Sequence, residues 1–536
     1  VRPVHWLLAL HGATVLPLQA FGHAADRYSR GHRFHHPQTV DIGHADDYPD
    51  RLETPGRVLV DMQRRRASIQ EQVSTAAREA GGTALLHDLL LDEVNALVEW
   101  PVALAGRFDP RFLALPREVL VATLEDHQRY FPVVDADGAL LPAFVTVANI
   151  ASRDPSHVVA GNERVLRPRL EDALFFWNRD LQRGLDARVA ELSGVAFQRG
   201  LGSLADKSQR VTALAATLAS GMGADGEALA RAAHLAKADL LTEMVGEFPE
   251  LQGTMGRYYA VQAGEAPTVA QALEEQYWPR HAKDAIPGHT TGRVLALADR
   301  LDSLAGLFAL GQRPSGEKDP FGLRRAALGV LRIVIEGRVA LDLAQALRDA
   351  VTAQPVDCDA ERLAADLLAF HLDRLRGYYA ERGVVPELFA AAAANGLRCP
   401  LDFDQRIAAL QAFVRNDRAV RLCGAHKRVR NILKNRRAIL RVSTDLFTEA
   451  AEHDLHAAMA SVQADVLGHC DRAEYAPALA RIADLADPVD RFFDKVRVMS
   501  DDAARQANRL ALLAALDGLF RSVADISWLS PAETSA

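Results

Sequence analysis

The sequence has few cysteines, few aromatic residues and no long apolar run. Four cysteines are scattered along the chain without a CxxC pair: Cys358, Cys399, Cys423 and Cys470. This distribution fits a reducing cytosol and argues against a disulfide framework or a structural zinc site. No apolar stretch approaches the ~20 residues that a membrane-spanning helix needs, and WLLAL at 6–10 is shorter than the ~7–15 residues of a signal-peptide core. We therefore expect a cytoplasmic protein without a membrane span.

The signatures of nucleotide-binding enzymes are also missing. The sequence contains no GxxxxGK[ST] loop, no GxGxxG after an expected strand, and no HIGH-like or KMSKS-like element. The first two patterns bring glycine backbone close to phosphate groups. The sequence therefore gives no support for a nucleotide site on this chain.

What is present is typical of a large globular protein. The chain has 536 residues, of which 49% are apolar and 25% charged, with a net charge of −8. One hydrophobic core does not grow to this size, so we expect three or four domains. Alanine and leucine are abundant and aromatics make up only 6%, which favours helices over sheets.

The first 190 residues have mixed patterns. Residues 129–150 predict a β-hairpin around Asp135–Gly138, with Gly138 suited to a positive φ. The run GRVLVDM at 56–62 predicts a strand, and 81–100 predicts a helix. We therefore expect a mixed α/β region over 1–190.

From about residue 195 the patterns are almost wholly helical. Residues 227–244 carry one apolar stripe at spacings of 3 and 4, and 287–311 predict a second helix that Gly311 ends. Asp319 and Pro320 suit the start of a helix over 321–337. Weak boundaries lie near 352–361 and 395–404, and the rest predicts a helical bundle. The fold class is thus mainly α and multidomain.

The helical middle contains a histidine and several aspartates, namely His234, Asp239, Asp299 and Asp302. Such residues could hold a divalent ion that activates water in a phosphohydrolase. However, His234 and Asp239 lie five positions apart and point about 140° apart on a helix. An adjacent His-Asp pair is absent, because the sequence reads Lys237-Ala238-Asp239 there, and the Lys237 ammonium group would repel a metal. A structural role is therefore favoured, with Asp239 capping a helix or pairing with a cation.

The strongest compositional signal lies at 415–441. This segment has ten Lys and Arg residues and only one acid, Asp417, so it carries +9 on a chain of −8. The spacing predicts that Arg430, Lys434, Arg437 and Arg441 share one helix face. Such a stripe is typical of phosphate-backbone binding. RNA fits better than DNA because no DNA-reading motif is present.

The alternative for this segment is a solvated face paired with acidic neighbours. His426 could stack on a base, although a lone histidine is weak evidence. Residues 492–520 predict one long helical stretch, on which Arg505 and Arg509 would extend the basic surface.

Several long segments resemble one family, the β subunit of the bacterial heterotetrameric glycyl-tRNA synthetase. They are VRPVHW (1–6), RGHRF (30–34), HQRYFPV (127–133), GNERVLRPRLEDALFF (161–176), LGSLADK (201–207), AKADLLTEMVGEFPELQGTMGRYYA (236–260), DPFGLRRAALGVLRI (319–333), KRVRNIL (427–433) and FFDKVRVM (492–499). The resemblance covers almost the whole chain. Family members begin upstream of Val1, so we also expect that an N-terminal portion is lacking here and that assembly with the α subunit is impaired.

The resemblance implies a division of labour within an α2β2 heterotetramer. The α subunit would hold the active site and use ATP with Mg, whereas this chain would bind tRNA(Gly) and no cofactor, DNA or membrane. It also implies a domain order, namely 1–190 mixed α/β, 195–340 a degenerate HD-like helical domain, 341–400 a helical linker, and 401–536 an anticodon-binding bundle similar to that of arginyl-tRNA synthetases.

The resemblance further implies two sets of residues. Lys207, His234, Asp239 and Asp299 would mark degenerate HD-like positions without a metal. The tRNA-binding residues would be Arg421, Lys427, Arg428, Arg430, Lys434, Arg437, Arg441 and Arg509, with no catalytic residue on this chain. At His426 family members tend to have asparagine. Two other functions stay open, a metal-dependent HD-type phosphohydrolase and a non-catalytic RNA-binding scaffold.

Overall fold

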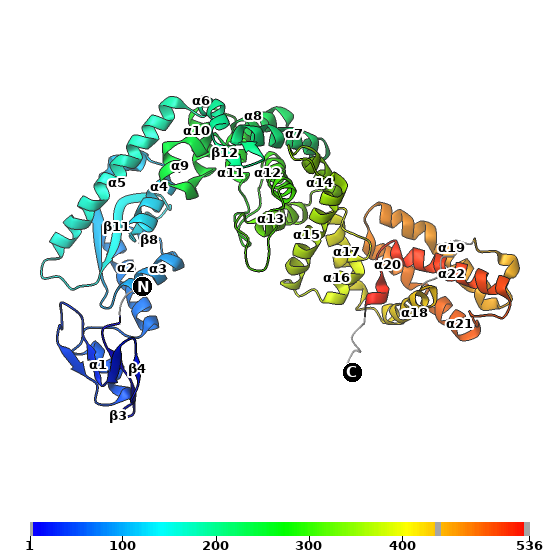
Figure 1. Ribbon diagram of the computed structural model, residues 1–536, viewed down its shortest axis with the longest axis horizontal. Coiled ribbons are helices and arrows are strands. Elements are labelled where there is room, and N and C mark those ends of the chain that lie inside the picture. Colours follow the sequence, from blue (N-terminus) through cyan, green and yellow to red (C-terminus); the bar gives the residue numbers. More distant parts are fainter. Residues whose placement is uncertain (1–3, 435–440, 530–536) are drawn as a thin grey trace. The chain divides into compact units, whose positions relative to one another are not determined.

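The computed structural model describes residues 4–434 and 441–529 (Figure 1). The chain forms two compact units. The first unit contains residues 1–184 and 240–252, and the second contains 185–239 and 253–536. The segment 240–252, which the sequence patterns assign to a continuous helical domain, thus packs with the N-terminal part of the chain.

The first unit is built around a four-stranded antiparallel sheet with the order β8-β10-β11-β9. Its strands are β8 (Thr83–Ala84), β9 (Val102–Arg107), β10 (Phe131–Val134) and β11 (Leu140–Ala148). The predicted hairpin is confirmed, because β10 pairs with β11 and Gly138 has a φ of +81° in the turn. Helices α2 (Met62–Glu79) and α3 (Asp88–Leu97) pack on this sheet through apolar side chains such as Ile69 and Leu91.

The strand predicted at 56–62 is wrong. Residues 56–61 precede α2 without a strand partner, and Asp61 accepts hydrogen bonds from backbone N–H groups in the first turn of α2. The N-terminal strands form small sheets instead. They are β1 (Leu7–Leu8), β2 (Leu10–His11), β3 (Thr14–Val15), β4 (Gln19–Ala20), β5 (His23–Asp26), β6 (Tyr28–Arg30) and β7 (Thr39–Asp41). The helix α1 (Tyr48–Glu53) follows them.

The long helix α5 (Pro155–Arg183) connects the returning segment to the first unit. Its buried Asp180 accepts hydrogen bonds from the backbone N–H groups of Glu243 (3.1 Å) and Met244 (3.0 Å) at the start of α9 (Glu243–Glu247). A carboxylate at this end of a helix satisfies free N–H donors. The short helix α4 (Arg117–Ala122) also belongs to this unit.

The first half of the second unit is a helical domain centred on α12 (Thr290–Ala309), which is buried along most of its length. It packs against α7, α11, α13, α14 and α15. The surrounding elements are α6 (Asp186–Val189), β12 (Ala196–Gln198), β13 (Gly202–Ser203), α7 (Leu204–Met222), α8 (Gly226–Leu235), α10 (Thr254–Gln262), α11 (Pro267–Glu275) and α13 (Leu323–Glu336).

Two helix predictions in this region need correction. The helix expected over 227–244 is broken, because α8 ends at Leu235 and a 3-10 turn over Ala238–Leu241 precedes α9. The helix expected over 321–337 begins at Leu323. Asp319 accepts hydrogen bonds from the N–H groups of Leu323 and Arg324 and so caps it, whereas Pro320 lies before the helix.

The remaining helices continue the second unit to the C-terminus. They are α14 (Leu343–Thr352), α15 (Ala360–Ala380), α16 (Pro386–Ala393), α17 (Pro400–Phe413), α18 (Asp417–Leu433), α19 (Ala450–Asp471), α20 (Tyr475–Ala483), α21 (Ala486–Lys495) and α22 (Ala503–Arg521). The stretch predicted as helical over 492–520 is interrupted between α21 and α22. None of the helices in the described ranges has the length and apolar character needed to span a bilayer.

Candidate nucleic-acid interface and a buried ionic cluster

A buried ionic cluster lies between α7 and α12. The Nζ atom of Lys207 is 3.1 Å from Asp299 Oδ1 and 3.1 Å from Asp302 Oδ2, and it donates a 2.8 Å hydrogen bond to the hydroxyl of Ser303. Lys207 also lies over the ring of Phe197 at 4.7 Å. The spacing of Asp299 and Asp302 places both carboxylates on the side of α12 that faces α7.

A second lysine completes the cluster. The Nζ atom of Lys237, in the turn after α8, is 3.1 Å from Asp299 Oδ1 and 4.4 Å from the ring centroid of Tyr277. The Asp302 carboxylate accepts further hydrogen bonds from Arg210 Nε (2.7 Å) and Gln354 Nε2 (3.0 Å). The buried Asp302 carboxylate is therefore both paired and hydrogen-bonded, as buried charge requires. The Asp299 Oδ1 atom lies at ion-pair distance from both ammonium groups without a hydrogen bond among the described residues.

The electrostatic effects are strong because the groups are buried. Burial opposes ionisation of Asp299, but the attraction of Lys207 and Lys237 outweighs it and holds the pKa of this carboxyl well below its usual range. Burial also works against the charge on Lys207, yet Asp299 and Asp302 raise its pKa. The pKa of Lys237 is lowered, chiefly by burial and despite Asp299. Lys237 is thus the less strongly paired of the two lysines.

The four residues predicted at HD-like positions do not all meet. Lys207 and Asp299 are in contact, whereas His234 is half exposed and lies 3.6 Å from Asp186. Asp239 is buried and accepts a 2.5 Å hydrogen bond from the N–H of Gly253, the residue that caps α10. Of the two structural roles expected for Asp239, capping a helix or pairing with a cation, this hydrogen bond agrees with the first. Sequence reasoning did not identify Arg210 as part of the cluster, because nothing local marks it.

These residues do not fit a divalent metal. Two ammonium groups occupy the space around Asp299 that a cation would need, and His234 lies beside Asp186 instead. Within the described ranges, no group of three or more His, Cys, Asp or Glu side chains could hold a metal ion. The chemistry of this cluster is that of a structural ionic contact, so we derive no metal-dependent step from it.

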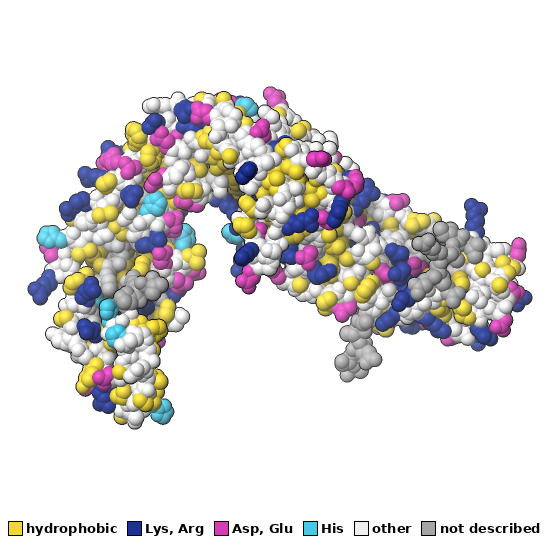
Figure 2. Space-filling model, in the orientation of Figure 1, with side chains coloured by type: hydrophobic (Ala, Val, Ile, Leu, Met, Phe, Trp, Pro, Cys, Tyr) yellow, Lys and Arg dark blue, Asp and Glu magenta, His cyan; other side chains and the backbone are white. Residues whose placement is uncertain are grey.

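The basic segment near the C-terminus forms α18, whose side chains differ in how they are paired. Lys427 and Arg428 are exposed on α18, and Lys434 is exposed just beyond it. The guanidinium of Arg428 lies over the ring of Phe493 at 4.4 Å, which orients it without neutralising its charge. Lys427, Arg428 and Lys434 have no carboxylate within 4 Å among the described residues. On the face seen in Figure 2, basic and acidic side chains intermingle over the C-terminal helices.

Two other predicted residues of α18 have internal partners. Arg421 pairs with Asp487 (2.8 Å) and Asp490 (2.9 Å) of α21. Arg430 lies 3.8 Å from Asp517 and 3.5 Å from Asp525. The acidic neighbours that the alternative interpretation required are therefore present for these two arginines. Both remain about half exposed, so their pairing is weak in water.

Arg509 was predicted on the basic surface, but it is buried. Its Nε atom is 2.8 Å from Glu452 Oε1, and the Arg509 and Glu452 side chains are only 7% and 0% exposed. Arg509 also donates to the carbonyl of Arg497 and the hydroxyl of Thr448. The prediction is wrong because a carboxylate from α19, distant in sequence, draws the guanidinium into the core.

The predicted four-residue stripe is also wrong. Helix α18 ends at Leu433, and Lys434 has a ψ of +129°, so the chain leaves the helix there. Arg441 lies in a non-helical stretch and is exposed. These residues therefore do not continue the helical face of Arg430, and Arg437 lies outside the described residues.

His426 does not face solvent. Its side chain is fully buried, and its Nε2 atom lies 2.9 Å from Asp517 Oδ1. The ring contacts Phe520 edge-on at 4.9 Å between centroids. In this arrangement His426 packs against Phe520 and Asp517 of α22 rather than on a nucleobase, so the suggested base contact is wrong.

Comparison with known proteins connects these sites to a family. The family profile described as "Glycyl-tRNA synthetase beta subunit" matches residues 1–394. The chain belongs to this family. A second profile, "DALR anticodon binding domain", matches residues 422–527, which include most of α18 and all of α19 to α22. The chain is thus a glycine–tRNA ligase subunit whose C-terminal helices form an anticodon-binding domain.

The sequences of individual relatives align with nearly the whole of this chain. A "Glycine--tRNA ligase beta subunit" of Chromohalobacter salexigens is 50% identical over 530 residues, which are 98% of this chain and 77% of the relative. Proteins of the same name from Hahella chejuensis and Pseudomonas aeruginosa are 46% and 47% identical. Their alignments cover 99% of this chain and 77% and 78% of the relatives. The glycyl-tRNA synthetase β subunits are thus similar to this chain in both of its units.

Proposed function

We propose that this chain binds tRNA(Gly) and positions it for glycylation by an α subunit, within an α2β2 heterotetramer in the cytoplasm. The α subunit would form glycyl-adenylate from glycine and ATP with Mg. This chain would supply binding energy and orientation. Holding the tRNA 3′ end against the adenylate makes a bimolecular step effectively unimolecular.

The exposed cations of the DALR domain carry this proposal. Lys427, Arg428 and Lys434 have no carboxylate within 4 Å among the described residues, in a protein with a net charge of −8. Ammonium and guanidinium groups without a carboxylate partner are available to phosphate oxygens. We assign Arg421, Arg430 and Arg441 a secondary role, since the first two must share their charge with aspartates.

We further propose that residues 195–340 derive from an HD-like domain whose metal site is replaced by the Lys207–Asp299–Lys237 contact. In this account the ionic cluster stabilises the domain and has no catalytic role. The proposed domain order is 1–190, 195–340, 341–400 and 401–536, with the exception that 240–252 packs with the first unit.

The proposal is tested by reversing two unpaired charges in Lys427→Glu/Lys434→Glu. Binding of tRNA(Gly) to the αβ complex should weaken, and the slope of log affinity against log salt should fall by about 0.7–0.9 for each phosphate that is no longer neutralised. Glycyl-adenylate formation, followed by ATP–pyrophosphate exchange without tRNA, should be unchanged.

The matched control is Arg348→Glu/Arg362→Glu, which makes the same charge change on α14 and α15. Among the described residues, neither of their guanidinium groups lies within 4 Å of a carboxylate. Equal tRNA affinity in the double reversal and the control would refute the assignment of α18. Glycylation by this chain without the α subunit would refute the division of labour.

The two other functions make distinct predictions. A phosphohydrolase would bind about one equivalent of manganese, iron or zinc and release it in Asp299→Ala, which the lysine contacts of Asp299 argue against. A pure RNA-binding scaffold would bind tRNA without associating with an α subunit. Co-purification with the α subunit, and glycylation only by the mixture, would exclude the scaffold.

A further inference from the structure

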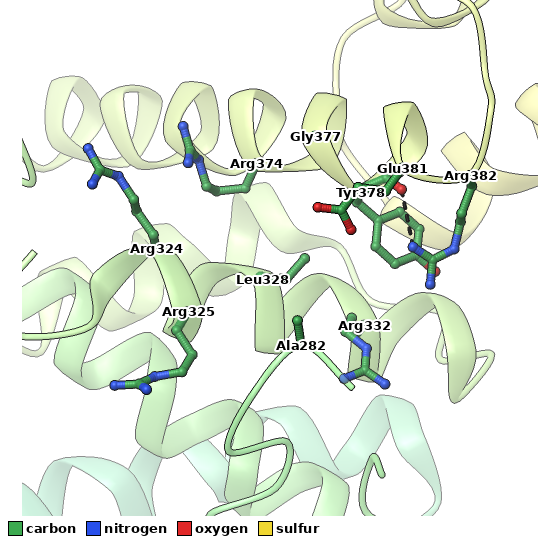
Figure 3. A pocket seen from close by; sticks show the side chains of 10 residues that line it. All are labelled: Ala282, Arg324, Arg325, Leu328, Arg332, Arg374, Gly377, Tyr378, Glu381 and Arg382. Carbon is green, nitrogen blue, oxygen red and sulfur yellow. Dashed lines mark hydrogen bonds between the residues drawn. The ribbon is translucent and has the colours of Figure 1, made fainter. Parts of the chain in front are cut away.

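A pocket rich in arginine lies between α13 and α15, far along the chain from α18. Figure 3 shows its lining from both helices and from the loop that contains Ala282. On α13, Arg324, Arg325, Leu328 and Arg332 are spaced so that they share one face. The residues that line the pocket from α15 and its C-terminal end also share one face by their spacing; they are Arg374, Gly377, Tyr378 and Glu381. The next residue, Arg382, lines the pocket as well.

The charge of the pocket is strongly positive. Five arginines line it, and Glu381 is the one acidic residue among the lining residues. Just outside, Glu336 accepts hydrogen bonds from Arg332 and lies 3.5 Å from Arg382, and Asp373 pairs with Arg374. These carboxylates fix the directions of three guanidinium groups.

The other two arginines keep their full charge. The Arg324 guanidinium donates a 2.6 Å hydrogen bond to the carbonyl of Gly316, and in the described part of the chain neither it nor the Arg325 guanidinium lies within 4 Å of a carboxylate. Basic side chains also gather over α13 and α15 on the face seen in Figure 2. The mouth of the pocket therefore presents unneutralised positive charge.

The size of the pocket restricts its ligand. Its volume is about 230 Å³, below the ~300–1,000 Å³ of sites that enclose whole small molecules. Tyr378 is only 6% exposed and the guanidinium of Arg382 covers one face of its ring at 3.5 Å from the centroid, so the ring offers little surface for stacking a base. An anionic group that belongs to a larger molecule fits these features better than a complete nucleotide.

We propose that this arginine pocket binds a backbone phosphate of the tRNA, at a contact separate from the anticodon-binding domain. The inference rests on the proposed tRNA-binding function. Arginine guanidinium groups form paired, charge-assisted hydrogen bonds with phosphate oxygens. Because phosphate contacts set register without reading sequence, this site positions the tRNA and does not select it.

Gly377 allows the pocket to be closed without removing any charge. It lies on α15 between Arg374 and Glu381, and a Cβ atom added there would meet no atom within 4 Å. A longer side chain can therefore enter the opening while the helix backbone stays in place. Gly377→Ala adds only a methyl group and improves helix propensity, so it serves as the control for Gly377→Gln.

The experiment measures tRNA(Gly) affinity of the αβ complex for Arg324→Gln/Arg325→Gln and for Gly377→Gln. We expect each to weaken binding about ten-fold, and the charge variant to lower the salt slope by about 0.7–0.9. Gly377→Ala and the charge-matched Arg348→Gln/Arg362→Gln should bind as the parent does. Phosphate-ethylation interference should identify one phosphate that matters for the parent but not for Arg324→Gln/Arg325→Gln.

The outcomes separate this inference from the proposed function. If Lys427→Glu/Lys434→Glu weakens binding but both pocket variants bind as their controls do, the pocket assignment is wrong and the proposed function stands. If none of these variants affects tRNA affinity, both are wrong. If ATP or inorganic phosphate binds the parent and not the charge variant, while tRNA affinity is equal, the pocket holds a free phosphate compound and the tRNA assignment fails.

Discussion

Two groups of basic side chains in the second unit have similar composition and opposite surroundings. In the buried cluster, Lys207 and Lys237 share the carboxylate of Asp299 at 3.1 Å and are almost inaccessible to solvent. On α18, Lys427 is exposed, and among the described residues no carboxylate lies within 4 Å of it. The comparison shows that nearby carboxylates, rather than the number of cations, determine whether a basic side chain stabilises the fold or is available to a ligand.

The same contrast exists within the DALR domain. Arg509 and Arg428 are both predicted to bind tRNA, but Arg509 contacts Glu452 in the core while Arg428 lies on the surface over Phe493. Removing each cation should therefore affect a different property, either the free energy of unfolding or the affinity for RNA.

The largest effect is expected for Lys207→Ala. It leaves the carboxylates of Asp299 and Asp302 without their shared ammonium group, and breaking a buried pair costs about 3–5 kcal/mol in the free energy of unfolding. Urea unfolding of the chain should show this as a lower midpoint for the second unit. The control is Arg398→Ala, which removes a surface pair with Asp342 and should cost about 0–1 kcal/mol. Equal costs would mean that the cluster does not stabilise the domain.

A somewhat smaller effect is expected for Arg509→Met. The unpaired Glu452 would keep hydrogen bonds from the N–H groups of Thr448 and Glu449, so we expect about 3 kcal/mol, the lower end of the range for a broken buried pair. At a temperature where the variant is folded, its tRNA affinity should match that of the parent. A selective decrease in tRNA affinity with unchanged stability would show that Arg509 contacts RNA.

The smallest effect separates two cations on the same helix. Lys427→Gln should lower the salt slope of tRNA binding by about 0.7–0.9. Arg421→Gln should lower it by less, because Asp487 and Asp490 already neutralise part of that charge. Titrations over a series of salt concentrations would compare the slopes. The pairing argument fails if Arg421→Gln has the larger effect.

The sequence predicts elements well where local chemistry determines them. The hairpin over 129–150 has a glycine at its turn, and the helix over 287–311 has a continuous apolar pattern. The broken helix at 227–244 shows the limit. Lys237 and Asp239 leave the helical path to reach Asp299 and the N-terminus of α10, and such distant partners are absent from the local pattern.

The candidate site was predicted only in part for the same reason. A dense basic segment can be recognised from composition, and Lys427 and Arg428 are exposed as expected. Because α18 ends at Leu433, helical spacing does not predict which residues share a face beyond that point. The partners of Arg509 and Arg430 come from residues far along the chain, so their pairing requires the tertiary structure.

The return of residues 240–252 to the first unit has a consequence for how the protein is made. The carboxylate of Asp180 accepts hydrogen bonds from the N–H groups of Glu243 and Met244. These two residues are synthesised only after residues 185–239 of the second unit. On the ribosome, the N-terminal unit therefore stays incomplete until that later stretch has emerged. A fragment ending at Gly184 would leave this buried acid exposed and α5 without one of its covering helices.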